Sequence, residues 1–311
     1  MANGSASPEA TGGAGTLYEY RVAALALSKL LRGAHVPVGI DLPVESVALQ
    51  QRIAGSVLDD IVMRASSAHG STAIEFQVKR KLAVTGSSEA LISTLSQVAE
   101  TWRTREYSLQ SGRLLLGVAA REPEADLREL GVLAVKARAH STLASFQLLF
   151  TDGVTDRRLR TRYDHVVTAL VAATGITQRS EADHLAHRIL SRLHVWQVDP
   201  AEDGRDWRMG LDDVMALARH SGQPANVLLD RLATLAATIG PHAGDLDADA
   251  VRARFNSKYS VDLPASEFQG SPLAKGIRIE GNGPTFIGNS QTFNGLTFNT
   301  HVPSNLSEEE A

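Results

Sequence analysis

Two neighbouring apolar segments carry polar side chains that could hold a divalent cation and activate water beside it. An acidic pair, Asp59 and Asp60, opens the first segment, and Gln77 and Lys79 alternate with apolar residues in the second. A carboxylate beside an amide oxygen supplies the hard oxygen ligands that Mg²⁺ prefers. A nearby lysine can activate the attacking water and offset charge in the transition state. These residue types therefore predict the chemistry of phosphodiester cleavage.

The positions of these residues depend on two predicted strands. The segments 58–63 and 73–79 should pair across the turn-forming residues 66–72, which include three serines and Gly70. Side chains alternate between the two faces of a strand, so the apolar and polar residues of the second strand should separate. The expected buried row is Ile74, Phe76 and Val78, and the expected polar row is Glu75, Gln77 and Lys79. The pairing would bring one carboxylate of the acidic pair close to the polar row. Glu75 of that row could be a further ligand, although we expect it to face solvent.

The order of these residues resembles the PD-(D/E)xK nuclease superfamily in its Mrr-like variant, whose second motif reads Q-x-K, here Gln77-Val78-Lys79. The resemblance implies that Asp60 is the aspartate of the first motif, with Asp59 as the alternative. It also implies a metal-binding glutamate from the first helix, and Glu19 is the candidate. The implied cofactor is Mg²⁺ or Mn²⁺. The proline of the first motif is absent and Gln77 replaces the acidic residue, which leaves the number of metal ions open.

A narrower resemblance spans roughly residues 13–260. The G-x-x-Y opening at Gly15–Tyr18, the aspartate and Q-x-K strands, and a helical second half are together similar to the endonuclease domain of CBASS and HerA-linked anti-phage effectors. This implies a metal-dependent endonuclease that cuts double-stranded DNA in a bacterial defence system. Two alternatives stay open: a non-catalytic adaptor that keeps the nuclease fold, and an RNA-directed nuclease.

Each of these residues also has an ordinary structural explanation. A lysine on an edge strand protects against aggregation. An Asp pair before a strand is common in turns, and a glutamate in the first turn of a helix is favoured by the helix dipole.

Composition narrows the class of protein. The chain has 311 residues, 43% of them apolar, and can bury a sizeable core. It lacks cysteine, a signal peptide and an apolar run long enough to span a membrane, which favours a cytoplasmic protein with no membrane partner. The net charge of −4 argues against non-specific coating of nucleic acid, but an enzyme needs only a local basic cleft. The candidates for that cleft are Lys79, Arg80, Lys81, Arg103, Arg105 and Arg113.

Hydrophobic periodicity predicts the elements that carry the site. After a leader over residues 1–14, expected to be disordered, the pattern predicts a helix, three strands, a helix, a strand and a helix between 15 and 150. This is the α/β core expected of a restriction-endonuclease-like fold. The predicted segments are 16–31, 35–44, 58–64, 73–80, 88–101, 113–119 and a helix that opens at Pro123.

Residues 151–265 predict an α-helical domain. Its arginine run 157–162 is a second candidate for the basic cleft, and we interpret it as a solvated helix face. His184, His187 and His194 could share one helical face, but the H-E-x-x-H arrangement is absent, so they are interpreted as surface or interface histidines. No glycine-rich phosphate loop is present either, which argues against an ATPase on this chain.

The last segment, 266–311, differs from the rest in composition. Between residues 276 and 299 Thr-Phe recurs, and Asn294-Gly295 is a strong hairpin signal. A lone two-stranded hairpin is at best marginally stable in water, so this tail should pack against something. We expect it to bind a partner protein or a second copy of the chain; packing on its own chain is the alternative.

Overall fold

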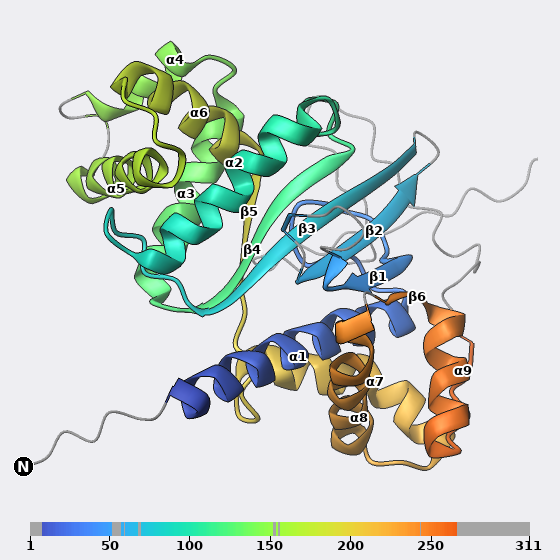
Figure 1. Cartoon of the computed structure of the whole chain (residues 1–311). Helices are drawn as coiled ribbons and strands as arrows, with labels where there is room; N and C mark the ends of the chain where they lie inside the picture. The colour runs from blue at the N-terminus through green and yellow to red at the C-terminus, as the bar shows by residue number, and fades with distance from the viewer. Residues whose placement is uncertain are drawn as a thin grey trace, which may run out of the picture. The chain divides into compact units, whose positions relative to one another are not determined.

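A six-stranded mixed sheet organises the part of the chain that the structure describes (Figure 1). The structure is a computed structural model that describes residues 8–51, 57–58, 60–67, 70–151, 154, 156–242 and 244–265. The strand order is β5-β4-β3-β2-β1-β6, with β3, β4 and β5 parallel and the other pairings antiparallel. The strands are β1 Ser46–Leu49, β2 Ile61–Ser67, β3 Gly70–Lys81, β4 Leu114–Glu122, β5 Leu193–Gln197 and β6 Asp245–Asp247.

Helices cover both faces of this sheet (Figure 1). One face packs with α1, α7, α8 and α9, and the other packs with α2, α3, α5 and α6. The helices are α1 Pro8–Arg32, α2 Glu89–Gln110, α3 Glu124–Ala139, α4 Leu143–Gln147, α5 Arg157–Thr174, α6 Arg179–Arg192, α7 Arg205–Ser221, α8 Ala225–Ile239 and α9 Ala248–Tyr259. None of these described helices is long and apolar enough to cross a membrane.

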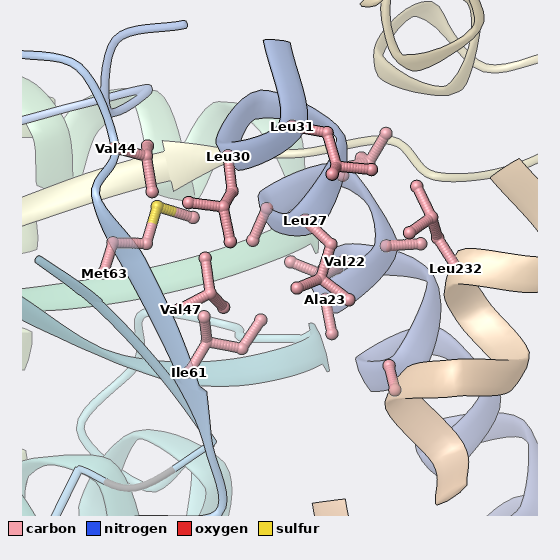
Figure 2. Close-up of a cluster of buried hydrophobic side chains, with 14 of the residues drawn as sticks. Val22, Ala23, Leu27, Leu30, Leu31, Val44, Val47, Ile61, Met63 and Leu232 are labelled. Atoms are coloured by element: carbon pink, nitrogen blue, oxygen red, sulfur yellow. The ribbon is translucent and has the colours of Figure 1, made fainter. Parts of the chain in front are cut away.

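Helix α1 fills the centre of the first layer (Figure 2). Its alanine and leucine residues favour helix, and they present apolar side chains on more than one side. Leu27 and Leu30 are completely buried between the sheet and α8, where they meet Met63 of β2 and Leu232 of α8. The helix ends at Arg32, and the φ of 70° at Gly33 suits the left-handed residue that follows a helix. The packing therefore holds α1 between the sheet and α8.

The hairpin predicted from segments 58–63 and 73–79 is confirmed. β2 and β3 pair antiparallel with Ile61 opposite Phe76 and Ser67 opposite Gly70. The central apolar strand is confirmed as well, because β4 lies between β3 and β5 and its first seven residues are buried. Gly117 of β4 allows the ring of Phe76 to lie against the strand, since a Cβ at position 117 would overlap that ring.

The structure differs from the sequence prediction in several places. The predicted strand 35–44 is a loop closed by one bridge between His35 and Pro43, because Gly39 has φ +84° and prolines cannot donate to a strand ladder. The segment predicted to be only helical also contributes β5 and β6 to the sheet. Helix α1 begins at Pro8, inside the predicted leader.

The observed architecture is thus a mixed α/β fold with many helices, and the restriction-endonuclease-like assignment stays a prediction. So do the domain boundaries at residues 150 and 265. The tail 266–311, with its proposed hairpin at 276–299, lies outside the described residues.

Candidate functional site

The polar row predicted for β3 exists, and it lies on the α2 side of the sheet. Glu75, Gln77 and Lys79 are in register with Leu116, Val118 and Ala120 of β4, which belong to the core beneath α2, α3, α5 and α6. Glu75 is only 2% exposed and Gln77 only 3%, whereas Lys79 is partly exposed. The expectation that Glu75 faces solvent is therefore wrong. Helix α2 packs over this part of β3. Strand alternation shows which residues share a face, but it does not show whether a helix covers that face.

Asp60 contacts the polar row directly. Its Oδ2 atom accepts a hydrogen bond from the amide Nε2 of Gln77 and another, 2.7 Å long, from the backbone N–H of Val78. Asp60 immediately precedes β2, so the hairpin register places it across from Gln77. Two donors on one carboxylate oxygen hold the side chain in one orientation. Asp59, the alternative aspartate, lies outside the described residues.

Gln77 has an oxygen suited to a cation. Its Nε2 is engaged by Asp60, while its Oε1 is buried and has no hydrogen-bond partner among the described residues. An unsatisfied buried amide oxygen costs about 1–3 kcal/mol, so such an atom calls for an explanation. A hard cation would satisfy it, because Mg²⁺ binds one or two protein carboxylates and completes its shell with water and phosphate oxygens.

The described residues contain no cluster of three or more His, Asp or Glu side chains arranged to hold a metal ion. A cation here would therefore depend on the amide oxygen as well as on carboxylates. Asp60 and Gln77 have the oxygen atoms that Mg²⁺ or Mn²⁺ prefers, and both could bind one cation once the Gln77 amide turns its oxygen toward Asp60 in place of Nε2.

Glu19 lies close to Asp60 through a small cavity. The cavity measures about 10 Å³, roughly the space of one water molecule. It is lined by Glu19, Tyr20, Ala23, Leu49, Gln50, Asp60 and Gly240. The structure therefore brings the candidate glutamate of α1 and the candidate aspartate to a common space, although their role as metal ligands stays a prediction.

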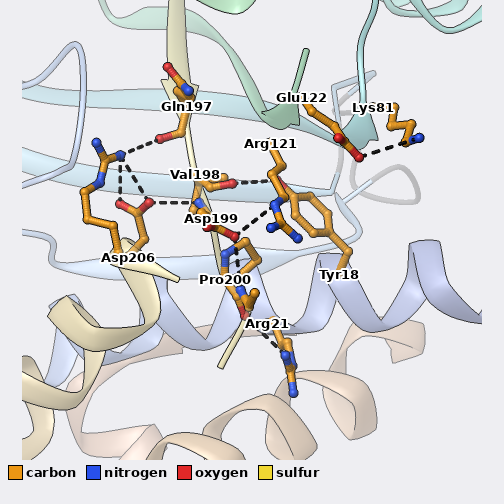
Figure 3. Close-up of polar contacts among 12 residues, drawn as sticks. Tyr18, Arg21, Lys81, Arg121, Glu122, Gln197, Val198, Asp199, Pro200 and Asp206 are labelled. Atoms are coloured by element: carbon orange, nitrogen blue, oxygen red, sulfur yellow. Dashed lines mark hydrogen bonds and ion pairs between the residues drawn. The ribbon is translucent and has the colours of Figure 1, made fainter. Parts of the chain in front are cut away.

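Tyr18, the neighbour of Glu19, ties α1 to the strand ends (Figure 3). Its hydroxyl donates a 3.1 Å hydrogen bond to the carbonyl of Val198, just after β5. Burial, and then the charge of Asp199, raise the pKa of the phenol above its usual range, so the group stays a donor. Asp199 in turn pairs with Arg121 of β4 at 3.0 Å. This network fixes the segment of α1 that carries Glu19.

An ion pair that the sequence analysis did not predict lies beside the candidate site. Arg105 of α2 donates through Nη1 to Oε1 of Glu75. The sequence predicts that Arg105 lines a basic cleft with Arg103 and Arg113. In the structure the charge of Arg105 is paired with a carboxylate on β3, while Arg103 and Arg113 are exposed. The signal available in the sequence was spacing, because Arg105 lies on the same helical stripe as the buried residues Thr101 and Leu109.

The arginines of the run 157–162 have two different roles. Arg162 is 14% exposed and pairs with Asp126 at 2.6 Å and Glu129 at 2.8 Å, so it joins α5 to α3. Arg157 and Arg158 are exposed, as a solvated helix face predicts, and they line a cavity of about 620 Å³. The prediction is right for the first turn of α5 and wrong for Arg162.

Comparison with known proteins gives weak similarity. No protein-family model matches the sequence, and no curated protein matches it. Among solved structures, the Acinetobacter baumannii Cap4 SAVED/CARF-domain receptor with the cyclic trinucleotide 2'3'3'-cAAA aligns with a TM-score of 0.41 and 13% identity, over 79% of this chain and 46% of that one. The Moraxella osloensis Cap4 SAVED/CARF-domain receptor aligns with a TM-score of 0.37 and 11% identity, over 85% and 57%. The chain thus spans about half the length of the structures it matches.

Proposed function

We propose that this protein is a metal-dependent DNA endonuclease of the PD-(D/E)xK type, acting as an effector in a bacterial anti-phage defence system. The observation that carries the nuclease proposal is the contact between Asp60 and Gln77 on the face of β3 that also bears Lys79. The resemblance of the motifs supplies the link to defence effectors and to double-stranded DNA as substrate.

The residues of the site would have two roles: three of them would bind the cation, and Lys79 would act on the attacking water and the phosphate. Asp60, the oxygen of Gln77, and Glu19 across the small cavity would hold the cation. Mg²⁺ or Mn²⁺, when bound, polarises a phosphate oxygen and lowers the pKa of a water molecule. Lys79 is two residues beyond Gln77 on the same face and has no ion-pair partner among the described residues. Its ammonium group is therefore available to orient the attacking water and to offset the charge on the phosphate.

Plasmid cleavage tests this proposal. Purified protein should nick or linearise plasmid DNA with Mg²⁺ or Mn²⁺, and Lys79→Ala should lower the rate by about 10²- to 10³-fold, as loss of one transition-state-stabilising group does. The fold should survive, because the Lys79 side chain is partly exposed and fills no core position. The matched control is Lys136→Ala on α3, a partly exposed lysine far along the chain from the site.

The outcomes separate the alternatives. Equal cleavage by wild type and Lys79→Ala would place the activity elsewhere or in a contaminant. Cleavage of RNA but not of plasmid would favour the RNA-directed nuclease. A folded protein that cuts neither substrate with either metal would favour a non-catalytic adaptor.

A further inference from the structure

A buried carboxylate, that of Glu75, lies beside the contact between Asp60 and Gln77. Glu75 precedes Gln77 by two residues on β3, so the two side chains leave the same face of the strand about 6.6 Å apart. Glu75 is opposite Val62 of β2, the residue two positions after Asp60. The three polar side chains Asp60, Gln77 and Glu75 are thus neighbours on one face of the hairpin.

The partner of Glu75 comes from a place where α2 departs from helical geometry. Arg105 has φ −132° and ψ 29°, within a helix that continues to Gln110. Its position on the core-facing stripe would suit an apolar residue, yet it carries a guanidinium group that reaches Glu75. The arginine side chain remains 34% exposed while the glutamate is 2% exposed, so solvent reaches the pair from the arginine side.

Stability alone is a poor reason for this pair. Removing two charges from water costs several kcal/mol for each ion, and well-packed apolar residues usually stabilise a core as well or better. A buried pair next to a site is therefore better explained by a use for one of its charges. Glu75 has the chemistry for such a use, because its carboxylate is a hard oxygen ligand.

We infer that Glu75 is a further carboxylate of the cation site formed by Asp60 and Gln77, and that Arg105 is the counter-charge that a divalent cation replaces. This inference rests on the proposed function for the existence of the cation site. Glu75 would add a negative charge to those of Asp60 and Glu19, and this charge would strengthen the attraction for Mg²⁺ or Mn²⁺. The guanidinium group and the cation compete for the same carboxylate, so Arg105 sets how tightly the cation binds.

Direct measurement of Mn²⁺ binding tests the inference without an activity assay. The free Mn²⁺ signal in electron paramagnetic resonance gives the dissociation constant for the full chain and its variants. Glu75→Gln should weaken binding roughly 10-fold or more, within the range seen when groups around a metal site are altered. Arg105→Gln should tighten it several-fold, and Arg105→Lys should restore a value near wild type. The control is Arg64→Gln, which removes the 2.7 Å ion pair with Asp245 on the neighbouring strands and should leave the dissociation constant unchanged.

Thermal unfolding with and without Mn²⁺ provides a second measurement for any variant that is poorly stable. Arg105→Gln leaves Glu75 buried without its arginine, so the Mn²⁺-dependent rise in its unfolding temperature should exceed that of wild type. An equal rise in both proteins would overturn the inference.

The variants also distinguish failure of the inference from failure of the proposed site. If Asp60→Asn abolishes Mn²⁺ binding while Glu75→Gln and Arg105→Gln bind as wild type does, Glu75 is a structural residue and the inference is wrong. If Asp60→Asn binds Mn²⁺ like wild type, the proposed site itself is wrong. If neither wild type nor Arg105→Gln binds Mn²⁺, both are overturned.

Discussion

At the scale of single residues, His194 shows how burial changes chemistry that the sequence pattern suggests. The sequence places it with His184 and His187 on a helical face, but it lies on β5, and its ring packs against Gly39. Burial, followed by the positive charges of Arg138 and Arg192, lowers the pKa of the ring to about 4. The ring is therefore neutral in the folded protein at neutral pH.

This shift predicts a pH dependence of stability. Unfolding restores the ordinary pKa of about 6.5, so between pH 6.5 and 4 the unfolded chain binds the proton more readily. The stabilising contribution is complete above pH 6.5 and is lost as the pH falls toward 4. Because solvent reaches part of the ring, we expect a slope below the one-proton limit of about 1.4 kcal/mol per pH unit.

Urea unfolding at pH 7.5 and pH 5 checks this dependence. His194→Gln should reduce the loss of unfolding free energy between the two pH values, whereas the exposed His184→Gln should leave the loss as in wild type. The same loss in all three proteins would mean that other groups control acid stability.

At the scale of elements, contact between β3 and its neighbours determines where the candidate site lies. Gly117 allows the ring of Phe76 to pack against β4, so Gly117→Ala should force the ring away and destabilise the protein by about 1–3 kcal/mol. The matched control is Gly131→Ala on α3, where the nearest atom to a new Cβ is Val195 Cβ at 3.9 Å. A helical glycine replaced by alanine should instead gain about 0.5–1 kcal/mol.

Urea unfolding of both glycine variants measures the difference. Equal effects at positions 117 and 131 would show that β4 can shift to make room for a methyl group, and that the Phe76 contact does not fix the sheet.

At the scale of the whole molecule, the prediction concerns the tail. The segment 276–299 has large apolar residues within a hairpin pattern, and open strand edges commonly pair with another chain. Removal of residues 276–311 should therefore leave the α/β unit folded but change the mass of the assembly or its binding to a partner protein. Light scattering of the full and truncated chains, together with circular dichroism, tests this. Identical masses and unchanged partner capture would indicate that the tail packs on its own chain.

The sequence by itself determined the local features of the site. Alternation over residues 74–79 fixed which side chains share a face, and the turn-forming segment predicted the hairpin that places Asp60 across from Gln77. These inferences succeed because strand period and turn chemistry are short-range properties of the chain.

Only the tertiary structure decided which polar groups are buried and which elements complete the sheet. Helix α2 shields Glu75 from solvent and supplies its partner Arg105, which is 30 residues away in the sequence. Strand β5 directly follows α6, and strand β6 directly precedes α9. These short segments are strands only because each pairs with an edge of the sheet. Burial and edge pairing arise from contacts between segments distant in sequence, and no local pattern records them.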